Sequence, residues 1–163
     1  MSNDELAFLS LVGARTRLDN REVSSVELTE AMLERIDALD ARLNAFITVL
    51  RDSALREAKA ADARLRDGAR SSLLGIPLAV KDLYNTAGIR TTGGARILAN
   101  NVPETDATVI RRLAEAGSVL LGKTNMMEFA YGYPHPDFGE TRNPWALERT
   151  AGGSSGGAAA AVA

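Results

Sequence analysis

The segment that most constrains this chain lies at residues 151–163, where two serines stand between two glycine pairs and a run of alanines follows. Alanine is the best helix former, so we expect a helix directly after the glycines. Glycine permits backbone conformations closed to other residues and lets neighbouring groups come close to the chain. The first N–H groups of a helix have no partner within it. The loop therefore gathers hydroxyls and amide donors in one place, which suits a polar or anionic group.

Three interpretations of residues 152–157 compete. A flexible linker is the simplest, but a linker would not usually run straight into a strong helix former. A phosphate-binding loop is the second, since a helix N-terminus after glycines binds anions. The Walker pattern, however, requires a lysine after the last glycine, and here Gly157 is followed by Ala158. The third is a serine activated by a lysine, a known alternative to the histidine triad.

The amino-acid content narrows the chemistry open to these serines. The chain has no cysteine and one histidine, His135, which stands between two prolines. Disulfides, thiolate metal sites and a cysteine nucleophile are therefore excluded, and a histidine zinc site or a Ser-His-Asp triad within this chain is disfavoured. Prolines break regular structure, so we expect His135 in an exposed loop rather than in catalysis.

Charge and hydropathy bear on partners and location. A net charge of −2 and a pI near 5.5 give no reason to expect direct nucleic-acid binding. No apolar run approaches the length needed to span a membrane, and the acidic residues 1–5 are unlike the start of a signal peptide. We therefore expect a cytoplasmic protein.

Helices are expected wherever apolar residues recur at helical spacing. Ser24 and Glu27 have the spacing of a capping box, which makes the helix that follows them the clearest. The predicted helices lie within residues 4–16, from Ser24 to Leu39, from Asp52 or Ser53 to Leu65, and from an N-cap at Asp106 to Gly117.

Strands are expected in three short apolar runs, at residues 45–50, 74–82 and 118–122. Residues 126–131 are predicted to form a helical turn, and Trp145 to pack its loop down. A helix, a glycine stop and an apolar strand follow one another at the third run, as in half of a βαβ unit. The fold class predicted from this pattern is α/β.

The second predicted strand ends in Lys81 and Asp82. A surface lysine at the start of a loop is the ordinary interpretation. A lysine at the end of a buried strand can instead be desolvated, which lowers its pKa and makes it usable as a base. The irregular loop at residues 83–95 follows directly, and loops at strand ends often carry function.

Five blocks together resemble the amidase signature family of hydrolases, and the resemblance extends from about residue 24 to the end of the chain. They are residues 43–48 (LNAFIT), 75–82 (GIPLAVKD), 122–126 (GKTNM), 142–145 (RNPW) and 152–157 (GGSSGG). The resemblance implies an α/β/α sandwich around a mixed sheet, preceded by a helical arm. Residues 1–70 would form a mainly helical arm, and residues 71–163 the start of a catalytic core that is incomplete at its C-terminus.

The resemblance also implies roles for particular residues. Lys81 matches the catalytic lysine, Ser154 the bridging serine that the family holds with a cis peptide bond, and Ser155 a supporting serine. A family loop near the substrate is matched by Ala130, Tyr131 and Gly132. The implied chemistry is a Ser–Ser–Lys relay: neutral Lys81 accepts a proton through Ser154 from a nucleophilic serine, which forms an acyl-enzyme that water then cleaves. No metal or cofactor is implied.

Two departures from the family pattern matter. The family's nucleophile lies in a further Gly-Gly-Ser block beyond residue 157, which these 163 residues do not reach, and Ala158 stands where the family usually has a serine. We therefore expect a truncated amidase that is inactive alone. Its exposed apolar faces would lead to poor solubility or to oligomerisation.

Three functions follow in order of preference. The first is a general amidase acting on a small-molecule amide, with no nucleic-acid or membrane partner and with a homo-oligomer as one option for its assembly. The second is the glutaminase subunit of a tRNA-dependent amidotransferase, which works with partner subunits. The third is a short non-catalytic remnant or binding module.

Overall fold

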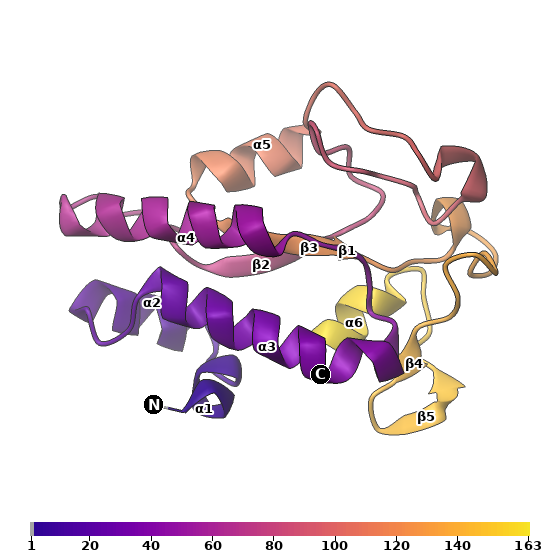
Figure 1. Cartoon of the computed structure of the whole chain (residues 1–163), viewed down its shortest axis with the longest axis horizontal. Helices are drawn as coiled ribbons and strands as arrows, with labels where there is room; N and C mark the ends of the chain where they lie inside the picture. The colour runs from indigo at the N-terminus through magenta and orange to yellow at the C-terminus, as the bar shows by residue number, and fades with distance from the viewer. Residues whose placement is uncertain (1) are drawn as a thin grey trace. The chain divides into compact units, whose positions relative to one another are not determined.

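The structure is a computed structural model and describes residues 2–163. Its contacts define two compact units, each built from discontinuous segments (Figure 1). Unit 1 comprises the described residues up to Ala38, Leu50–Leu78 and Arg112–Leu121, and unit 2 comprises Leu39–Val49, Ala79–Arg111 and Gly122–Ala163. The predicted division into an arm over residues 1–70 and a core over residues 71–163 stays a prediction.

Two short helices begin the chain where one was expected. Helix α1 spans Asn3–Ala7 and α2 spans Leu11–Asn20. The break arises at Ser10, whose hydroxyl accepts a hydrogen bond from Gly13 N at 3.0 Å and caps the start of α2. The prediction of one helix over residues 4–16 is wrong, because an internal serine supplies a second N-cap.

Helix α3 spans Ser25–Leu43 and begins as the sequence predicts. Ser24 N donates to Glu27 Oε2 at 2.8 Å, and Glu27 N donates to Ser24 Oγ at 3.1 Å, which confirms the capping box.

Helix α4 spans Arg51–Arg66 and starts earlier than predicted. Its N-cap is Leu50, which makes no side-chain capping bond, and Ser53 Oγ donates to Leu50 O at 3.0 Å. The predicted caps at Asp52 or Ser53 are therefore wrong. Within unit 1, α4 packs into a cluster of buried residues: Leu33, Ala54, Ala58, Val119 and Leu121.

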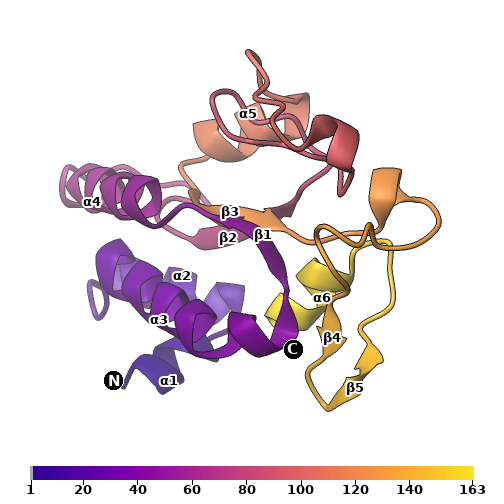
Figure 2. The ribbon, with the colours of Figure 1, turned by 45° about the vertical axis from the view of Figure 1, so that its right-hand side comes forward.

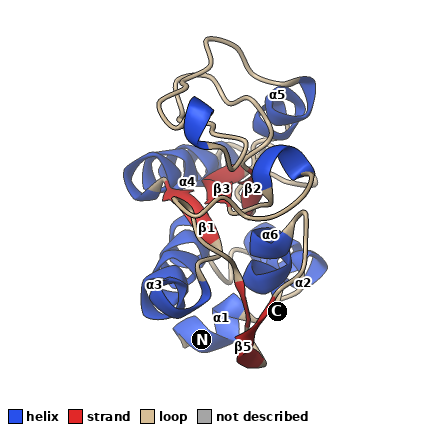
Figure 3. Ribbon diagram, turned by 90° about the vertical axis from the view of Figure 1, so that its right-hand side faces the viewer, coloured by secondary structure: helices blue, strands red, loops and turns tan. Residues whose placement is uncertain are grey.

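Three strands form the main sheet, in the order β1-β3-β2 (Figure 3). They are β1 (Phe46–Val49), β2 (Pro77–Lys81) and β3 (Val119–Thr124). Strand β1 is antiparallel to β3. Strand β3 is parallel to β2, because the residue numbers increase in the same direction along both strands. Val119 N donates to Ile76 O, and farther along Asp82 N donates to Thr124 O. The sheet is therefore mixed, as expected, and β3 extends two residues beyond the predicted strand.

The short 3₁₀ helix η1 (Arg96–Leu98) and helix α5 (Thr108–Glu115) follow the loop after β2. The predicted N-cap of α5 is wrong, because the Asp106 carboxylate accepts from Ala87 N at 2.7 Å across that loop. Gly117 has a φ of +84°, in agreement with its predicted place after the helix.

The last part of unit 2 carries two predicted features and one that was not predicted. Helix α6 (Gly156–Val162) follows the glycines as expected, and the helical turn predicted within residues 126–131 is the 3₁₀ turn η2 (Glu128–Ala130). A hairpin of β4 (Arg142–Asn143) and β5 (Ala146–Thr150) was not predicted, and α6 lies against β4 (Figure 2). Trp145 at its turn is 79% exposed, so the prediction that it packs the loop is wrong.

Candidate functional site

Lys81 and Ser154 lie together although 73 positions separate them. Strand β2 ends at Lys81, and Lys81 Nζ is 2.7 Å from Ser154 Oγ. Burial lowers the pKa of Lys81 below its ordinary value. Within residues 2–163 no carboxylate forms an ion pair with this amine to oppose that effect. The neutral amine of Lys81, which can accept a proton, therefore forms at a lower pH than that of an exposed lysine.

The loop that carries Ser154 is held by backbone contacts. The Gly153–Ser154 peptide bond is cis, as the family resemblance implies. Ser154 O accepts from Met127 N at 3.2 Å. A Cβ on Gly153 would stand 2.5 Å from the end of the Met127 side chain, so the glycine allows this close approach.

Helix α6 is fixed just after the serines by an unusually close packing of main chains. Gly157 N donates to Asn125 O at 3.0 Å, and Asn125 N donates to Ala45 O at 2.8 Å. A Cβ on Gly157 would lie only 2.3 Å from Ala45 O. Only glycine fits here, so packing explains Gly157, the second residue of the second glycine pair.

Asn125 joins several main-chain segments of unit 2 and was not predicted from the sequence. Its side chain is 1% exposed, and Nδ2 reaches three main-chain oxygens, of Asn44 at 3.1 Å, Gly139 at 3.2 Å and Phe138 at 3.4 Å. Its Oδ1 accepts from Met126 N at 2.8 Å. An asparagine directly after an apolar strand was the one available signal.

The other predicted site residues are placed less tightly. Ser155 is the exposed N-cap of α6 and makes no side-chain capping bond. Ala130 has a φ of +61°, and Tyr131 is 88% exposed. In the described chain no hydrogen bond joins the segment of Ala130, Tyr131 and Gly132 to Lys81 or Ser154. Their predicted roles stay predictions.

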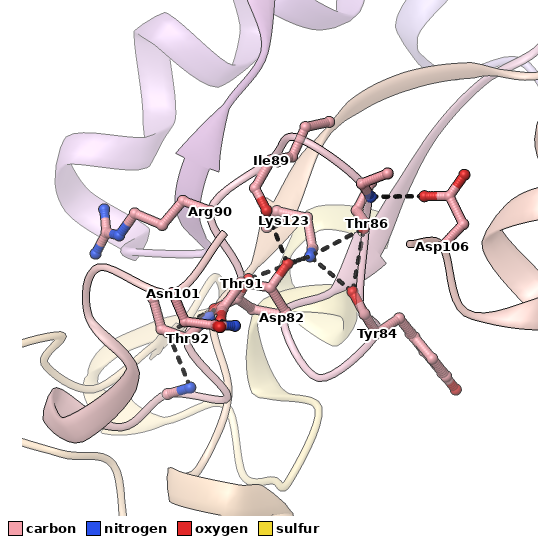
Figure 4. Close-up of polar contacts among 12 residues, drawn as sticks. Asp82, Tyr84, Thr86, Ile89, Arg90, Thr91, Thr92, Asn101, Asp106 and Lys123 are labelled. Carbon is pink, nitrogen blue, oxygen red and sulfur yellow. Dashed lines mark hydrogen bonds and ion pairs between the residues drawn. The ribbon is translucent and has the colours of Figure 1, made fainter. Parts of the chain in front are cut away.

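A second buried lysine lies next to the site and was also missed. Lys123 on β3 and Asp82, which follows Lys81, are both fully buried, with 3.4 Å between Nζ and Oδ1 (Figure 4). Lys123 Nζ donates to Thr91 Oγ1 at 2.7 Å, Tyr84 O at 2.8 Å and Thr86 Oγ1 at 3.1 Å. Burial lowers the pKa of Lys123, and the Asp82 carboxylate opposes that change.

Four observations concern other parts of the described chain. Nowhere in residues 2–163 do three His, Cys, Asp or Glu side chains gather as a metal ion would require. The same residues contain no helix long and apolar enough to cross a membrane. His135 is half-buried rather than exposed, and its Nδ1 accepts from Asp137 N at 3.1 Å. A small open recess beside the Ser154 loop is lined by Met126, Met127 and Gly152 among others, but not by Lys81 or Ser154.

The family follows from comparison with known proteins. The family model described as Amidase matches residues 27–163. The chain therefore belongs to the amidase family, a class of hydrolases.

Several curated relatives share one name. The A subunit of glutamyl-tRNA(Gln) amidotransferase from Geotalea daltonii is 51% identical over 98% of this chain, and the protein of that name from Aromatoleum aromaticum is 55% identical over 94%. The match covers 33% and 32% of those two proteins. This chain therefore spans about a third of the length of these relatives.

Solved structures give the fold. The native peptide amidase of Stenotrophomonas maltophilia is 38% identical, with a TM-score of 0.82 over 93% of this chain and 33% of that protein. A bacterial aryl acylamidase of the amidase signature family has a TM-score of 0.87 at 31% identity, over 96% of this chain and 33% of that one. The predicted fold class, the N-terminal part of the amidase signature fold, is confirmed.

Proposed function

We propose that Lys81 and Ser154 are the base and the bridging serine of an amide-hydrolysing Ser–Ser–Lys relay. The observation that carries the proposal is the 2.7 Å contact between Lys81 Nζ and Ser154 Oγ, with the pKa of Lys81 lowered by burial. A lysine base must be neutral to accept a proton near neutral pH, and desolvation favours that form.

The proton path follows from this contact. Neutral Lys81 takes the proton of Ser154, and Ser154 takes the proton of a nucleophilic serine that attacks the amide carbonyl. The amine or ammonia leaves with a proton returned along the same path, and water then hydrolyses the acyl-enzyme. Ser155 would support this site, and Ala130, Tyr131 and Gly132 would lie near the substrate. The relay requires neither metal nor cofactor.

The nucleophile is supplied, in this proposal, by a segment that follows residue 163 in the full-length protein. The chain spans about a third of its curated relatives, and the family resemblance places the nucleophile after the Gly-Gly-Ser-Ser-Gly-Gly loop. Among residues 2–163 no second serine hydroxyl forms a hydrogen bond with Ser154. The segment alone would then be inactive.

Two enzyme functions, with different substrates, are candidates. A general amidase acting on small amides is supported by the peptide amidase and aryl acylamidase among the structural neighbours. The glutaminase subunit of a tRNA-dependent amidotransferase is favoured by a specific observation: the A subunit of that name from Aromatoleum aromaticum is 55% identical over 94% of this chain, whereas a solved amidase is 40% identical over the same share. In that case the protein would work with partner subunits, in the cytoplasm.

The test uses the full-length protein. Lys81→Ala and Ser154→Ala should each remove most amide hydrolysis and leave the circular dichroism spectrum unchanged, while the exposed Lys59→Ala should retain activity. Near-normal turnover by Lys81→Ala would refute the relay. Ammonia release from glutamine that rises when partner subunits and tRNA are added would identify the amidotransferase subunit. Hydrolysis of small amides without them would identify a general amidase.

A further inference from the structure

We propose that the buried Asp82–Lys123 pair is a positioning device that fixes the end of β2 and the loop after it, so that Lys81 Nζ stays at Ser154 Oγ. The inference rests on the proposed function, because it assigns supporting residues to the same relay. Every contact that carries it lies within unit 2.

The pair lies at the point where β2 passes into the loop that follows it. Asp82 is the first residue after β2 and directly follows Lys81. Its carboxylate contacts Lys123, with 3.4 Å between Nζ and Oδ1, whereas the side chain of Lys81 contacts Ser154. Within unit 2, Figure 2 shows α6 on one side of the ends of β2 and β3 and the loop of residues 83–107 on the other. The pair therefore joins the end of β3 to the residue that follows Lys81.

Lys123 organises the loop as a cation. An ammonium group has three N–H donors and no acceptor. Its three acceptors, Tyr84 O, Thr86 Oγ1 and Thr91 Oγ1, match that number and come from two parts of the loop after β2 (Figure 4). A neutral amine would leave one of them without a donor. The Asp82 carboxylate balances the charge, and the Asp106 carboxylate favours it from farther away.

Asp82 connects this cation to the main chain around Lys81. Its Oδ2 accepts from Thr92 N at 2.8 Å and from Thr92 Oγ1 at 2.5 Å, whereas Oδ1 has only the ion pair. Asp82 N donates to Thr124 O at 3.1 Å, and Asp82 O accepts from Gly93 N at 3.0 Å. Both backbone groups and both carboxylate oxygens of Asp82 are therefore engaged, which leaves little freedom to the residue that precedes it.

The same network continues toward Ser154. Gly93 O accepts from Phe129 N at 2.8 Å, and Met127, two residues earlier, donates its N–H to Ser154 O at 3.2 Å. A short series of main-chain bonds thus leads from Asp82 to the serine that faces Lys81. A disturbance at the ion pair would reach both members of the Lys81–Ser154 pair.

The experiment compares Asp82→Asn, Lys123→Met and the double variant in the full-length protein. In Asp82→Asn the carboxamide still accepts from Thr92, but Lys123 loses its counter-charge. We expect kcat to fall about 100-fold with KM nearly unchanged, as for a small displacement of a catalytic group. The double variant, which leaves no unpaired charge, should lose less than the product of the two single losses.

A second readout follows Lys81 itself. Competitive acetylation with acetic anhydride, followed by mass spectrometry of the Lys81 peptide, gives the pH midpoint of Lys81 reactivity. Both single variants should raise this midpoint toward about 10.4, the value of an ordinary lysine, because a loosened site admits water. The control is Asp40→Ala, which removes a carboxylate that accepts from Ala45 N and Phe46 N elsewhere in unit 2. It should lower stability and leave the midpoint unchanged.

The outcomes separate the two proposals. If Asp82→Asn and Lys123→Met lower stability as Asp40→Ala does but leave the Lys81 midpoint unchanged, the pair is only structural and the inference is overturned. If Lys81→Ala retains turnover, the relay fails, and the acetylation midpoint still reports whether the pair positions Lys81. A double-variant loss equal to the product of the single losses would also overturn the inference, since the pair would not act as one device.

Discussion

The substitution Gly157→Ala tests how α6 is held against the rest of unit 2. Helix propensity alone predicts a gain, because alanine in a helix is favoured over glycine by about 1 kcal/mol. The structure predicts a loss. A Cβ at this position would stand 2.3 Å from Ala45 O, 2.5 Å from Asn125 N and 2.6 Å from Asn125 O. These are main-chain atoms, which cannot turn aside as a side chain can.

The size of the loss follows from what must move. Overpacking costs about 1–3 kcal/mol. Moving α6 away also strains the bonds from Gly157 N to Asn125 O and from Asn125 N to Ala45 O, each worth about 1 kcal/mol. After subtracting the helix gain of about 1 kcal/mol, we expect the free energy of unfolding to fall by about 2–4 kcal/mol.

Urea denaturation followed by far-ultraviolet circular dichroism measures this change, and Gly156→Ala is the matched control. A Cβ on Gly156 would meet its nearest neighbour, Thr141 Cβ, at an ordinary 3.5 Å. That variant should be neutral or more stable by up to about 1 kcal/mol. If Gly157→Ala proved as stable as the parent chain, the close docking of α6 would be wrong, and with it the explanation of Gly157 by packing.

Three further predictions concern the same unit. Asn125→Ala should lower the free energy of unfolding by about 3 kcal/mol in the same denaturation assay, because it leaves several buried main-chain groups without partners; a change under about 0.5 kcal/mol would contradict the bonding described. In the full-length protein the rate of amide hydrolysis should rise with pH, with a midpoint below the ordinary lysine pKa of about 10.4, because burial lowers the pKa of Lys81 and only its neutral form accepts a proton. A rate that does not change with pH over that range would argue against Lys81 as the base. Burial raises the pKa of Asp40, so the stability that its protonated form contributes is present in acid and is lost as pH rises through the raised pKa. Asp40→Asn keeps an acceptor for Ala45 N and Phe46 N and should lose this pH dependence when the free energy of unfolding is measured from pH 3 to 7. Parallel curves of unfolding free energy against pH for the two proteins would contradict this prediction.

Local sequence signals predicted the elements that depend on near neighbours. The capping box at Ser24, the strand at β1 and the glycine stop at Gly117 all follow from residues a few positions apart. The predictions were wrong where the structure depends on residues far apart in the sequence. Asp106 bonds to Ala87 N instead of capping α5, and Trp145 lies exposed on a hairpin whose pairing no local pattern indicated.

The residue types in the sequence indicated a lysine and a serine as candidates for the site, and the family resemblance predicted that Lys81 pairs with Ser154. Lys81 and Ser154 are 73 positions apart, and no periodicity could bring them together. Asn125 was missed for a similar reason, because its role depends on oxygens contributed by Asn44, Phe138 and Gly139, which come together only in the fold.

Two lysines in this chain have nearly the same sequence context, since each ends or nearly ends an apolar strand: Lys81 in β2 and Lys123 in β3. Their environments separate them. Lys123 has three acceptors and a buried carboxylate, so its ammonium form is retained despite burial. Lys81 is partly desolvated, has one hydroxyl as its partner and, among the described residues, forms no ion pair. The loss of its proton therefore breaks no ion pair and costs less free energy than it would at Lys123. The partners, rather than the lysine or its strand, therefore decide which residue can act as a base and which can only hold the structure in place.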